Sequence, residues 1–156
     1  MSYLKAIGMG VVAGMRSMTA PALVSHELNR THSRELDDTP LAFLATPAAE
    51  TVTRFLAQGE RAADKTPWIP DRISPLGLTA RGVSGALAGA ALCSGDGYLP
   101  EAGAAMGAVG ALVSAFAMYH LRKRLGEALR VPDPLLGALE DAVAVGGGLL
   151  ILRAES

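Results

Sequence analysis

The stretch Gly8-Met-Gly-Val-Val-Ala-Gly-Met-Arg-Ser-Met-Thr-Ala-Pro21 lies inside an apolar segment that covers residues 4–24. As a helix this segment would be ~31 Å long, close to the thickness of a bilayer's hydrocarbon core. Arg16 lies at its middle, where a charge costs at least ~2.5–3.5 kcal/mol and usually faces a bundle interior. Pro21 removes a backbone donor and disturbs the carbonyl one turn earlier, near Ser17. The stretch therefore predicts an interrupted membrane helix that carries a buried cation.

The composition suits a membrane protein whose helices pack through small residues. Of the 156 residues, 50% are hydrophobic and only 4% aromatic, and the mean hydropathy is +0.30. The length is that of a single domain, residues 1–156. The 19% of charged residues keeps a soluble all-α domain as an alternative. A net charge of −1 argues against a nucleic-acid partner, which would require a basic surface.

The sequence lacks the residue patterns of a metal site or an enzyme. Cys93 is the single cysteine, so neither an internal disulfide nor a structural thiolate cluster can form. His26, His32 and His120 do not have the spacing of metal ligands. The Gly8-x-Gly10-x-x-Ala13 pattern resembles a dinucleotide fingerprint, but no strand precedes it, which favours helix packing. We expect no cofactor, no metal and no catalytic activity.

Four further helical segments follow the first. One begins near Thr46-Pro47, where Thr can cap a helix and Pro suits its first position, and ends near Asp64. Its polar residues repeat along one face, which leaves two alternatives. It lies in the membrane interface, or it spans the bilayer from as early as Leu41 with its polar face towards the interior. The other segments are 80–94, 101–121 and 135–152, and loops are expected at 25–40 and 65–79. The prediction is an all-α polytopic membrane bundle of about five hydrophobic segments.

Six glycines have the spacing of close helix packing, in which small residues let two backbones approach. They are Gly10, Gly14, Gly85, Gly89, Gly103 and Gly107. So short a chain has few spans with which to enclose a polar site alone. We therefore expect a homo-oligomer, in contact with membrane lipids.

The distribution of basic residues predicts an orientation. Five crossings would place nine basic residues on the side of the amino terminus and three on the opposite side. The positive-inside rule then places the amino terminus in the cytoplasm and the carboxyl terminus outside, in the inner (cytoplasmic) membrane.

A weak internal repeat is also visible. Residues 4–64 and residues 101–152 each contain a glycine-rich helix, a loop and a second helix with a Glu near one end. The single span between them would invert one pair relative to the other, as in many small transporters. Chance similarity of Gly/Ala-rich helices explains the pattern equally well.

The candidate site is built around Arg16, with Ser17 and Thr19 at the opened backbone. The carboxylates nearest to the spans are Glu60, Asp64, Glu140 and Asp141. Pairing with Arg16 would lower the cost of burying its charge, and Glu140 is the first choice of partner, with Glu60 next. Arg16 is then either a packing clamp between helices or the receptor of an anionic group. A further alternative is that Glu140 or Asp141 carries a proton or a cation.

Several motifs together resemble a known family. They are Gly-Met-Arg16-Ser with Pro21, Glu60-x-x-x-Asp64-Lys65-x-Pro67, Arg81-x-x-Ser-Gly85-Ala-Leu-Ala-Gly89, Tyr119-His-Leu-Arg122 and Leu139-Glu-Asp141-Ala. On these residues, and over nearly its whole length, the chain resembles the domain of unknown function 4126 family of small bacterial integral membrane proteins. The resemblance implies a multi-pass membrane protein and brings no activity with it.

Two functions from different classes fit this sequence. The first is a transporter or channel for a small solute, anionic if it meets Arg16, with the facing carboxylates at the same site. The second is a non-transporting lipid-binding or scaffold protein that uses its glycine faces and its basic Arg122-Lys-Arg124 stretch. An enzyme acting on lipid headgroups is less favoured, because no nucleophile is evident.

Overall fold

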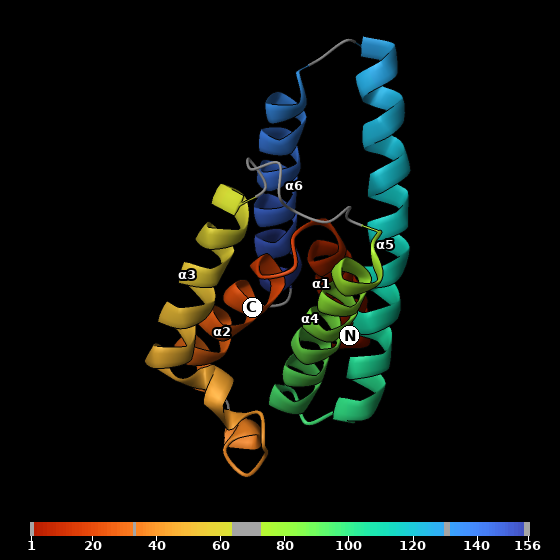
Figure 1. The fold of residues 1–156 in the computed structure, drawn as a ribbon. Coiled ribbons are helices and arrows are strands. Elements are labelled where there is room, and N and C mark those ends of the chain that lie inside the picture. Colours follow the sequence, from red (N-terminus) through yellow and green to blue (C-terminus); the bar gives the residue numbers. More distant parts are fainter. Residues whose placement is uncertain (1, 33, 64–72, 130–131, 155–156) are drawn as a thin grey trace.

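The computed structural model describes residues 2–32, 34–63, 73–129 and 132–154, and this part of the chain is all-α (Figure 1). Its α-helices are α1 (Ser2–Met15), α2 (Thr19–Thr31), α3 (Pro47–Ala63), α4 (Pro75–Gly95), α5 (Pro100–Leu129) and α6 (Asp133–Arg153). Two short 3-10 turns, η1 (Arg34–Leu36) and η2 (Ala42–Ala45), lie between α2 and α3. The predicted fold class is confirmed, including the interruption of the first helix.

Among the described residues, three helices are long and apolar enough to cross a membrane. They are α4, residues 100–128 of α5 and residues 134–153 of α6, whereas α1 is apolar but shorter. Large apolar side chains such as Leu76, Val109 and Leu150 are exposed on these helices. Such an outward apolar surface is typical of helices that face lipid.

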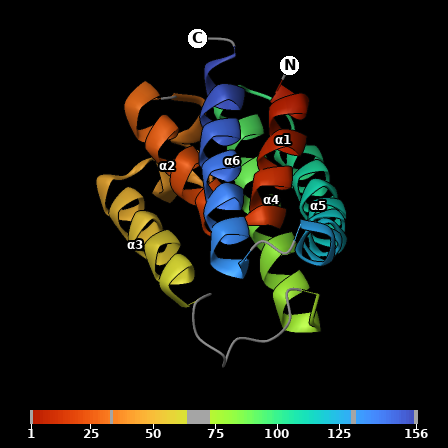
Figure 2. The ribbon, with the colours of Figure 1, turned by 90° about the horizontal axis from the view of Figure 1, so that it is seen from above.

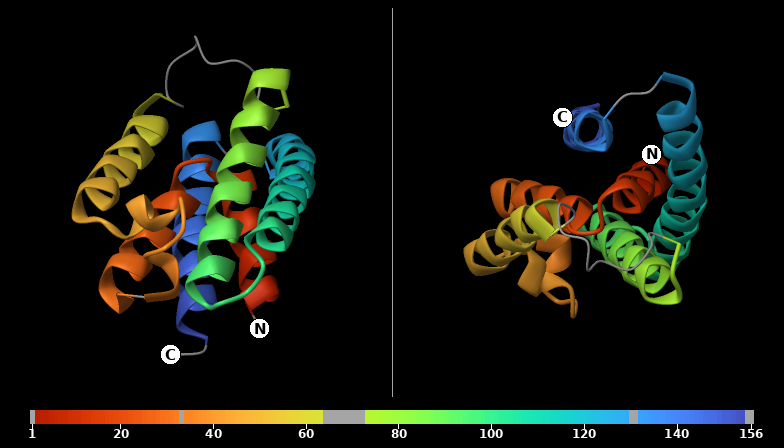
Figure 3. Two further views of the ribbon diagram at one scale, coloured as in Figure 1. Left: turned by 90° about the horizontal axis from the view of Figure 1, so that it is seen from below. Right: turned by 45° about the horizontal axis from the view of Figure 1, so that its top comes forward.

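Along the chain the helices alternate in direction, and Figure 2 and the left view of Figure 3 show the two chain ends at the same end of the bundle. Ser2 Oγ donates to Asp96 Oδ2 over 2.6 Å, which fixes the start of α1 beside the turn between α4 and α5. Near the other terminus, a Cβ on Gly8 would touch the Ile151 side chain of α6. We call this the terminal end of the bundle and the opposite one the far end.

This arrangement corrects the predicted topology. The segment 4–24 does not cross in one direction, because the chain reverses at residues 16–18 and α2 returns towards the terminal end (Figure 2). Five crossings would place the two termini at opposite ends of the bundle, whereas here they lie at the same end. The side of the membrane on which the amino terminus lies stays a prediction. The sequence showed the break but not the angle between its two halves.

Two helix boundaries also differ from the prediction. The third span begins at Pro75 rather than residue 80, because the Ser74 hydroxyl accepts from Gly77 N over 3.2 Å and Pro75 occupies the first turn. Its 21 residues are long enough to span a bilayer. The expected loop at 25–40 starts later, since α2 continues to Thr31. The basic stretch 122–124 belongs to α5.

Close backbone contacts hold α1, α4 and α5 together. A Cβ on Gly10 or on Gly85 would overlap the carbonyl oxygen of Gly107, and one on Gly89 would overlap that of Gly103. A Cβ on Gly14 would likewise overlap the carbonyl oxygen of Ala111. The six packing glycines therefore lie at contacts within one chain, which form a dense three-helix unit on one side of the bundle.

Helix α3 carries its apolar face outwards and its polar face inwards. Val52, Phe55 and Leu56 are exposed, Phe55 to 80%. On the inner side Glu50 binds His26 and Asn29, and Glu60 binds the backbone of the helix break. Not every polar side chain of α3 faces inwards, because Arg54 and Gln58 are exposed as well. Both alternatives, a spanning helix and an interfacial one, therefore stay open.

The weak internal repeat stays a prediction. Helix α5 is continuous over 30 residues and has no break that would correspond to the one after Met15.

Candidate functional site at the helix break

The break between α1 and α2 is short. Arg16 N still donates to Val12 O over 2.8 Å, and Thr19 N donates to Arg16 O over 3.2 Å. Pro21 lies in the first turn of α2, where a backbone N–H has no intrahelical acceptor, so the proline costs no helical hydrogen bond. The chain thus turns within three residues, which leaves backbone groups on both sides that need partners.

The donors at the start of α2 are bound by Glu60. Ser17 N donates to Glu60 Oε1 and Met18 N to Glu60 Oε2, each over 2.9 Å. A carboxylate at a helix N-terminus also interacts favourably with the helix dipole. Charge-assisted hydrogen bonds of this kind contribute about 1.5–3 kcal/mol each. Glu60 therefore ties the break to α3.

The acceptors at the end of α1 are bound by α4 and α5. Arg81 Nε donates to Gly14 O over 3.1 Å, and the Ser84 hydroxyl donates to Ser17 O. From α5, Ser114 Oγ donates to Val11 O over 2.8 Å. Arg81 is only 7% exposed, so it places a cation at the C-terminus of α1, where the dipole favours positive charge.

Arg16 is buried and paired. It is 4% exposed, and its Nε lies 2.6 Å from Asp141 Oδ1 on α6. Arg61 Nε lies 3.9 Å from the same oxygen, so Asp141 stands between two guanidinium groups. Arg16 thus contacts protein on all sides, which is the geometry of a clamp rather than of a solvent-facing receptor.

Glu140, the first choice of partner for Arg16, is buried on α6, and Arg122 Nη1 lies 3.4 Å from its Oε2. The neighbouring residue Asp141, also among the candidates, forms the ion pair with Arg16 Nε described above. The two guanidiniums meet α6 at one place, since a Cβ on Gly137 would lie 3.8 Å from Nη2 of both Arg16 and Arg122.

The structure brings Arg16, Ser17, Glu60, Glu140 and Asp141 to one region. Thr19 is beside them, 3% exposed, and within the described chain its hydroxyl makes no hydrogen bond. Asp64 lies outside the described residues. Sequence reasoning missed four members of the region: Arg61, Arg81, Ser84 and Arg122. The signal was the Arg81-x-x-Ser84 spacing, which puts two polar groups on one face of an otherwise apolar helix.

The charged region lies nearer the far end than the middle of the bundle. Arg81 and Glu140 each lie about two turns after the start of their helix, and Arg122 about two turns before the end of α5. This corresponds to a depth of about 10 Å from the helix ends. Arg16, at the middle of residues 4–24 in the sequence, thus lies at the far-end side of the bundle in the structure.

A cavity of about 320 Å³ adjoins the break between α2, α3 and α6. Its polar lining consists of Thr19, His26, Arg54, Gln58 and Arg61, and its apolar lining of Ala22, Leu23, Ala57 and Val145. The cavity therefore reaches the second arginine beside Asp141 but not Arg16 itself.

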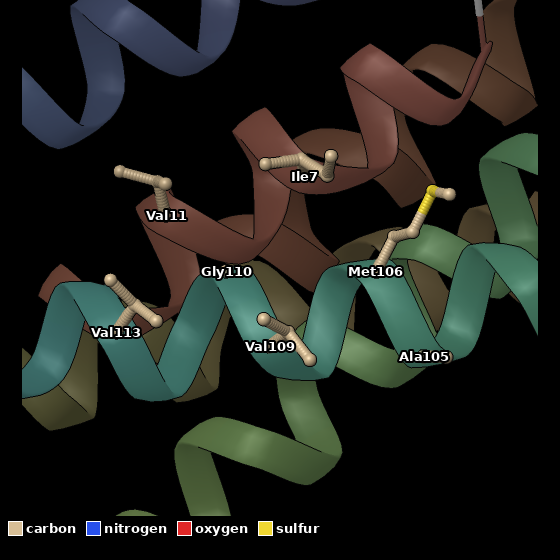
Figure 4. A pocket seen from close by; sticks show the side chains of 7 residues that line it. All are labelled: Ile7, Val11, Ala105, Met106, Val109, Gly110 and Val113. Atoms are coloured by element: carbon tan, nitrogen blue, oxygen red, sulfur yellow. The ribbon is translucent and has the colours of Figure 1, made fainter.

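Two other hollows have a different character. One of about 360 Å³ lies between α1 and α5, and Figure 4 shows only apolar side chains around it, such as Ile7, Val109 and Val113. Another of about 240 Å³ lies between α5 and α6 and is mainly apolar, with the Arg122–Glu140 pair at its wall. The first hollow stays away from the break, whereas the second is lined by Met15, the last residue of α1.

Across the described ranges no group of three or more His, Cys, Asp or Glu residues is placed to hold a metal ion.

Comparison with known proteins gives one match. A family model described as "Domain of unknown function (DUF4126)" matches residues 4–154. The search of curated proteins and the search of solved structures found no match.

Proposed function

Because the chain belongs to the DUF4126 family, a domain of unknown function, we propose its role from the helix break itself: it carries or conducts a small solute across a membrane. The observation that supports this role is the interrupted helix pair beside a polar cavity, in a chain with three helices able to cross a bilayer. Discontinuous helices that place backbone ends at a binding site are common in small transporters.

The contacts around the break suggest how such a carrier could work. Glu60 joins the break to α3, and Asp141 joins Arg16 to α6. In contrast, α1, α4 and α5 are joined by backbone contacts at glycines. The polar contacts can be exchanged for contacts with water or solute, whereas the glycine contacts cannot. Helices α2 and α3 would then move against the α1–α4–α5 unit to open the cavity.

A scaffold or lipid-binding protein is the second candidate. The buried, paired Arg16 favours it, because the arginine behaves as a clamp. The apolar hollow between α1 and α5 is suited to a lipid chain or to a second copy of this protein (Figure 4). The expected homo-oligomer would use this surface rather than the six packing glycines, which are occupied within the chain.

We place the protein in the cytoplasmic membrane with its far end in the cytoplasm. In the sequence, residues 61–74 and 122–132, which lead from α3 to α4 and from α5 to α6, contain seven basic residues. The segments at the terminal end contain four, which are Lys5, Arg30, Arg34 and Arg153. The positive-inside rule then puts both termini outside. This proposed orientation differs from the cytoplasmic amino terminus expected from five crossings, and the labelling experiment described in the Discussion separates the two.

Solute flux tests the proposal. Purified protein is reconstituted into liposomes, and efflux of entrapped phosphate, succinate and glycerol is compared with that from empty liposomes. In the Glu60→Gln variant the side-chain amide places an N–H group opposite one of the two backbone N–H donors of the break. One charge-assisted hydrogen bond, worth about 1.5–3 kcal/mol, is lost, so we expect the flux to differ from that of the wild type. Glu127→Gln, an exposed change on α5, is the matched control. Wild-type liposomes no leakier than empty ones to all three solutes would leave the scaffold as the function.

A further inference from the structure

We infer that the cavity between α2, α3 and α6 binds a small oxyanion, a carboxylate or a phosphate, and that Thr19 and Arg61 contact it. The inference rests on the proposed function, because it names the class of solute that the protein would carry. The binding site that it assigns does not include Arg16. Its volume of about 320 Å³ is at the lower end for ligand sites, which suits a solute of few atoms.

The polar lining consists of groups that donate hydrogen bonds. Arg54 and Arg61 supply guanidinium groups, and Thr19 supplies a hydroxyl. The amide of Gln58 and the imidazole of His26 complete the polar lining, and none of the lining residues is an acid. Cations prefer oxygen ligands from carboxylates and carbonyls, so this lining fits an anion better.

Two of these groups have no hydrogen-bond partner within the described chain. One is the hydroxyl oxygen Oγ1 of Thr19, a residue that is only 3% exposed, and the other is the buried Nε of Arg61. Arg61 Nε stands 3.9 Å from Asp141, which is beyond hydrogen-bond distance. Buried polar groups normally have a partner, because leaving them without one destabilises the protein. An oxyanion in the cavity would supply acceptors for both.

The other basic groups are held near the cavity by an acidic residue outside its lining. Arg54 Nη2 lies 2.8 Å and His26 Nδ1 2.9 Å from Glu50 Oε1. Glu50 also accepts from Asn29 Nδ2 over 2.6 Å. Glu50 therefore orients Arg54 and His26 beside the cavity. Thr19 and Arg61 are less exposed than Arg54 and would contact the anion in the inner part of the cavity. Arg16, paired with Asp141, stays outside the lining.

Binding is tested on the full chain in nanodiscs of phosphatidylcholine, by calorimetric titration with inorganic phosphate, succinate and, as the neutral probe, glycerol. We expect heat with the two anions and none with glycerol. Thr19→Val, which keeps the shape and removes the hydroxyl, should weaken anion binding about tenfold. Arg61→Gln should weaken it about 10- to 100-fold, and Arg61→Lys less. Arg153→Gln, an exposed arginine of α6, is the matched control and should bind normally.

A variant that changes only the volume of the cavity tests the site even if the Thr19 and Arg61 variants fail to fold. Val145→Phe fills the cavity from α6 without changing any charge, and should abolish binding while helix content is retained. A further arm uses nanodiscs with phosphatidylglycerol and no added solute. Thermal stabilisation there that is lost in Thr19→Val identifies a lipid headgroup as the source of the oxyanion. Absence of binding in every arm, or equal binding by Val145→Phe, would overturn the inference.

The outcomes also separate this inference from the proposed function. Anion binding that depends on Thr19, with no flux in liposomes, supports the site and removes the transport role. Flux of glycerol alone, with no anion binding, supports transport and overturns the oxyanion site.

Discussion

Asp141 is the residue on which the buried charges of this protein depend most directly. Its Oδ1 lies 2.6 Å from Arg16 Nε and 3.9 Å from Arg61 Nε, so one carboxylate faces two cations from different helices. Arg16 is 4% exposed and Asp141 27%, so the arginine is the more deeply buried member of the pair. Removing Asp141 is costly because it takes a carboxylate away from that buried charge.

We predict that Asp141→Asn lowers the free energy of unfolding by about 3–5 kcal/mol, the range for breaking a buried ion pair. Arg16→Gln should be destabilising for the same reason, and the double variant should recover part of the loss. Thermal unfolding in one detergent, with wild type, both single variants and the double, measures this. Additive losses in the double variant would mean that the two side chains do not act as a pair.

At the scale of helices, the glycines make the clearest prediction. Gly107→Ala should be strongly destabilising, because its Cβ would overlap the carbonyl oxygen of Gly85 on α4. Gly146→Ala on α6 meets nothing within 4 Å and is the matched control, with a gain of at most about 1 kcal/mol from helix propensity. The two melting temperatures should differ clearly, and similar values would show that α4 and α5 separate easily.

The sequence predicted helices more successfully than it predicted their ends and directions. Thr46-Pro47 and residues 135–152 were placed within two residues, because a cap and an apolar run are local signals. Ser74-Pro75 carries the same kind of signal, but the neighbouring prolines and Gly77 favoured a loop. The reversal at residues 16–18 depends on partners far along the chain, such as Glu60 and Arg81, so no local pattern could reveal it.

The candidate site shows the same limit. The need of Arg16 for a carboxylate followed from its place in an apolar segment, and Asp141 was among the four candidates. The choice between Glu140 and Asp141 depends on the rotation of α6, which two adjacent acids do not specify. Arg81 was predicted only as the second residue of the segment 80–94, and its burial follows from the earlier start of α4 at Pro75.

For the whole molecule, the direction of each helix predicts which segments share a side of the membrane. An epitope at the amino terminus, an epitope at the carboxyl terminus and a cysteine at Asp38 should all be reached from outside intact cells. A cysteine at Ala128, at the far end, should react only after the membrane is opened. The native Cys93 is fully buried and should not interfere. An amino terminus protected while the carboxyl terminus is reached would restore a full crossing by residues 4–24.

The helix break also has a consequence for the order in which the chain is made. Arg16 leaves the ribosome early, but Glu60 follows 43 residues after Ser17, and Asp141 is 125 residues after Arg16. Until α6 has been synthesised, the guanidinium of Arg16 lacks the carboxylate that it meets in the finished protein. The pair of helices α1 and α2 therefore reaches its final packing only after α6 has been inserted. A chain that stops before α6 should be degraded faster than the full chain by membrane-bound proteases.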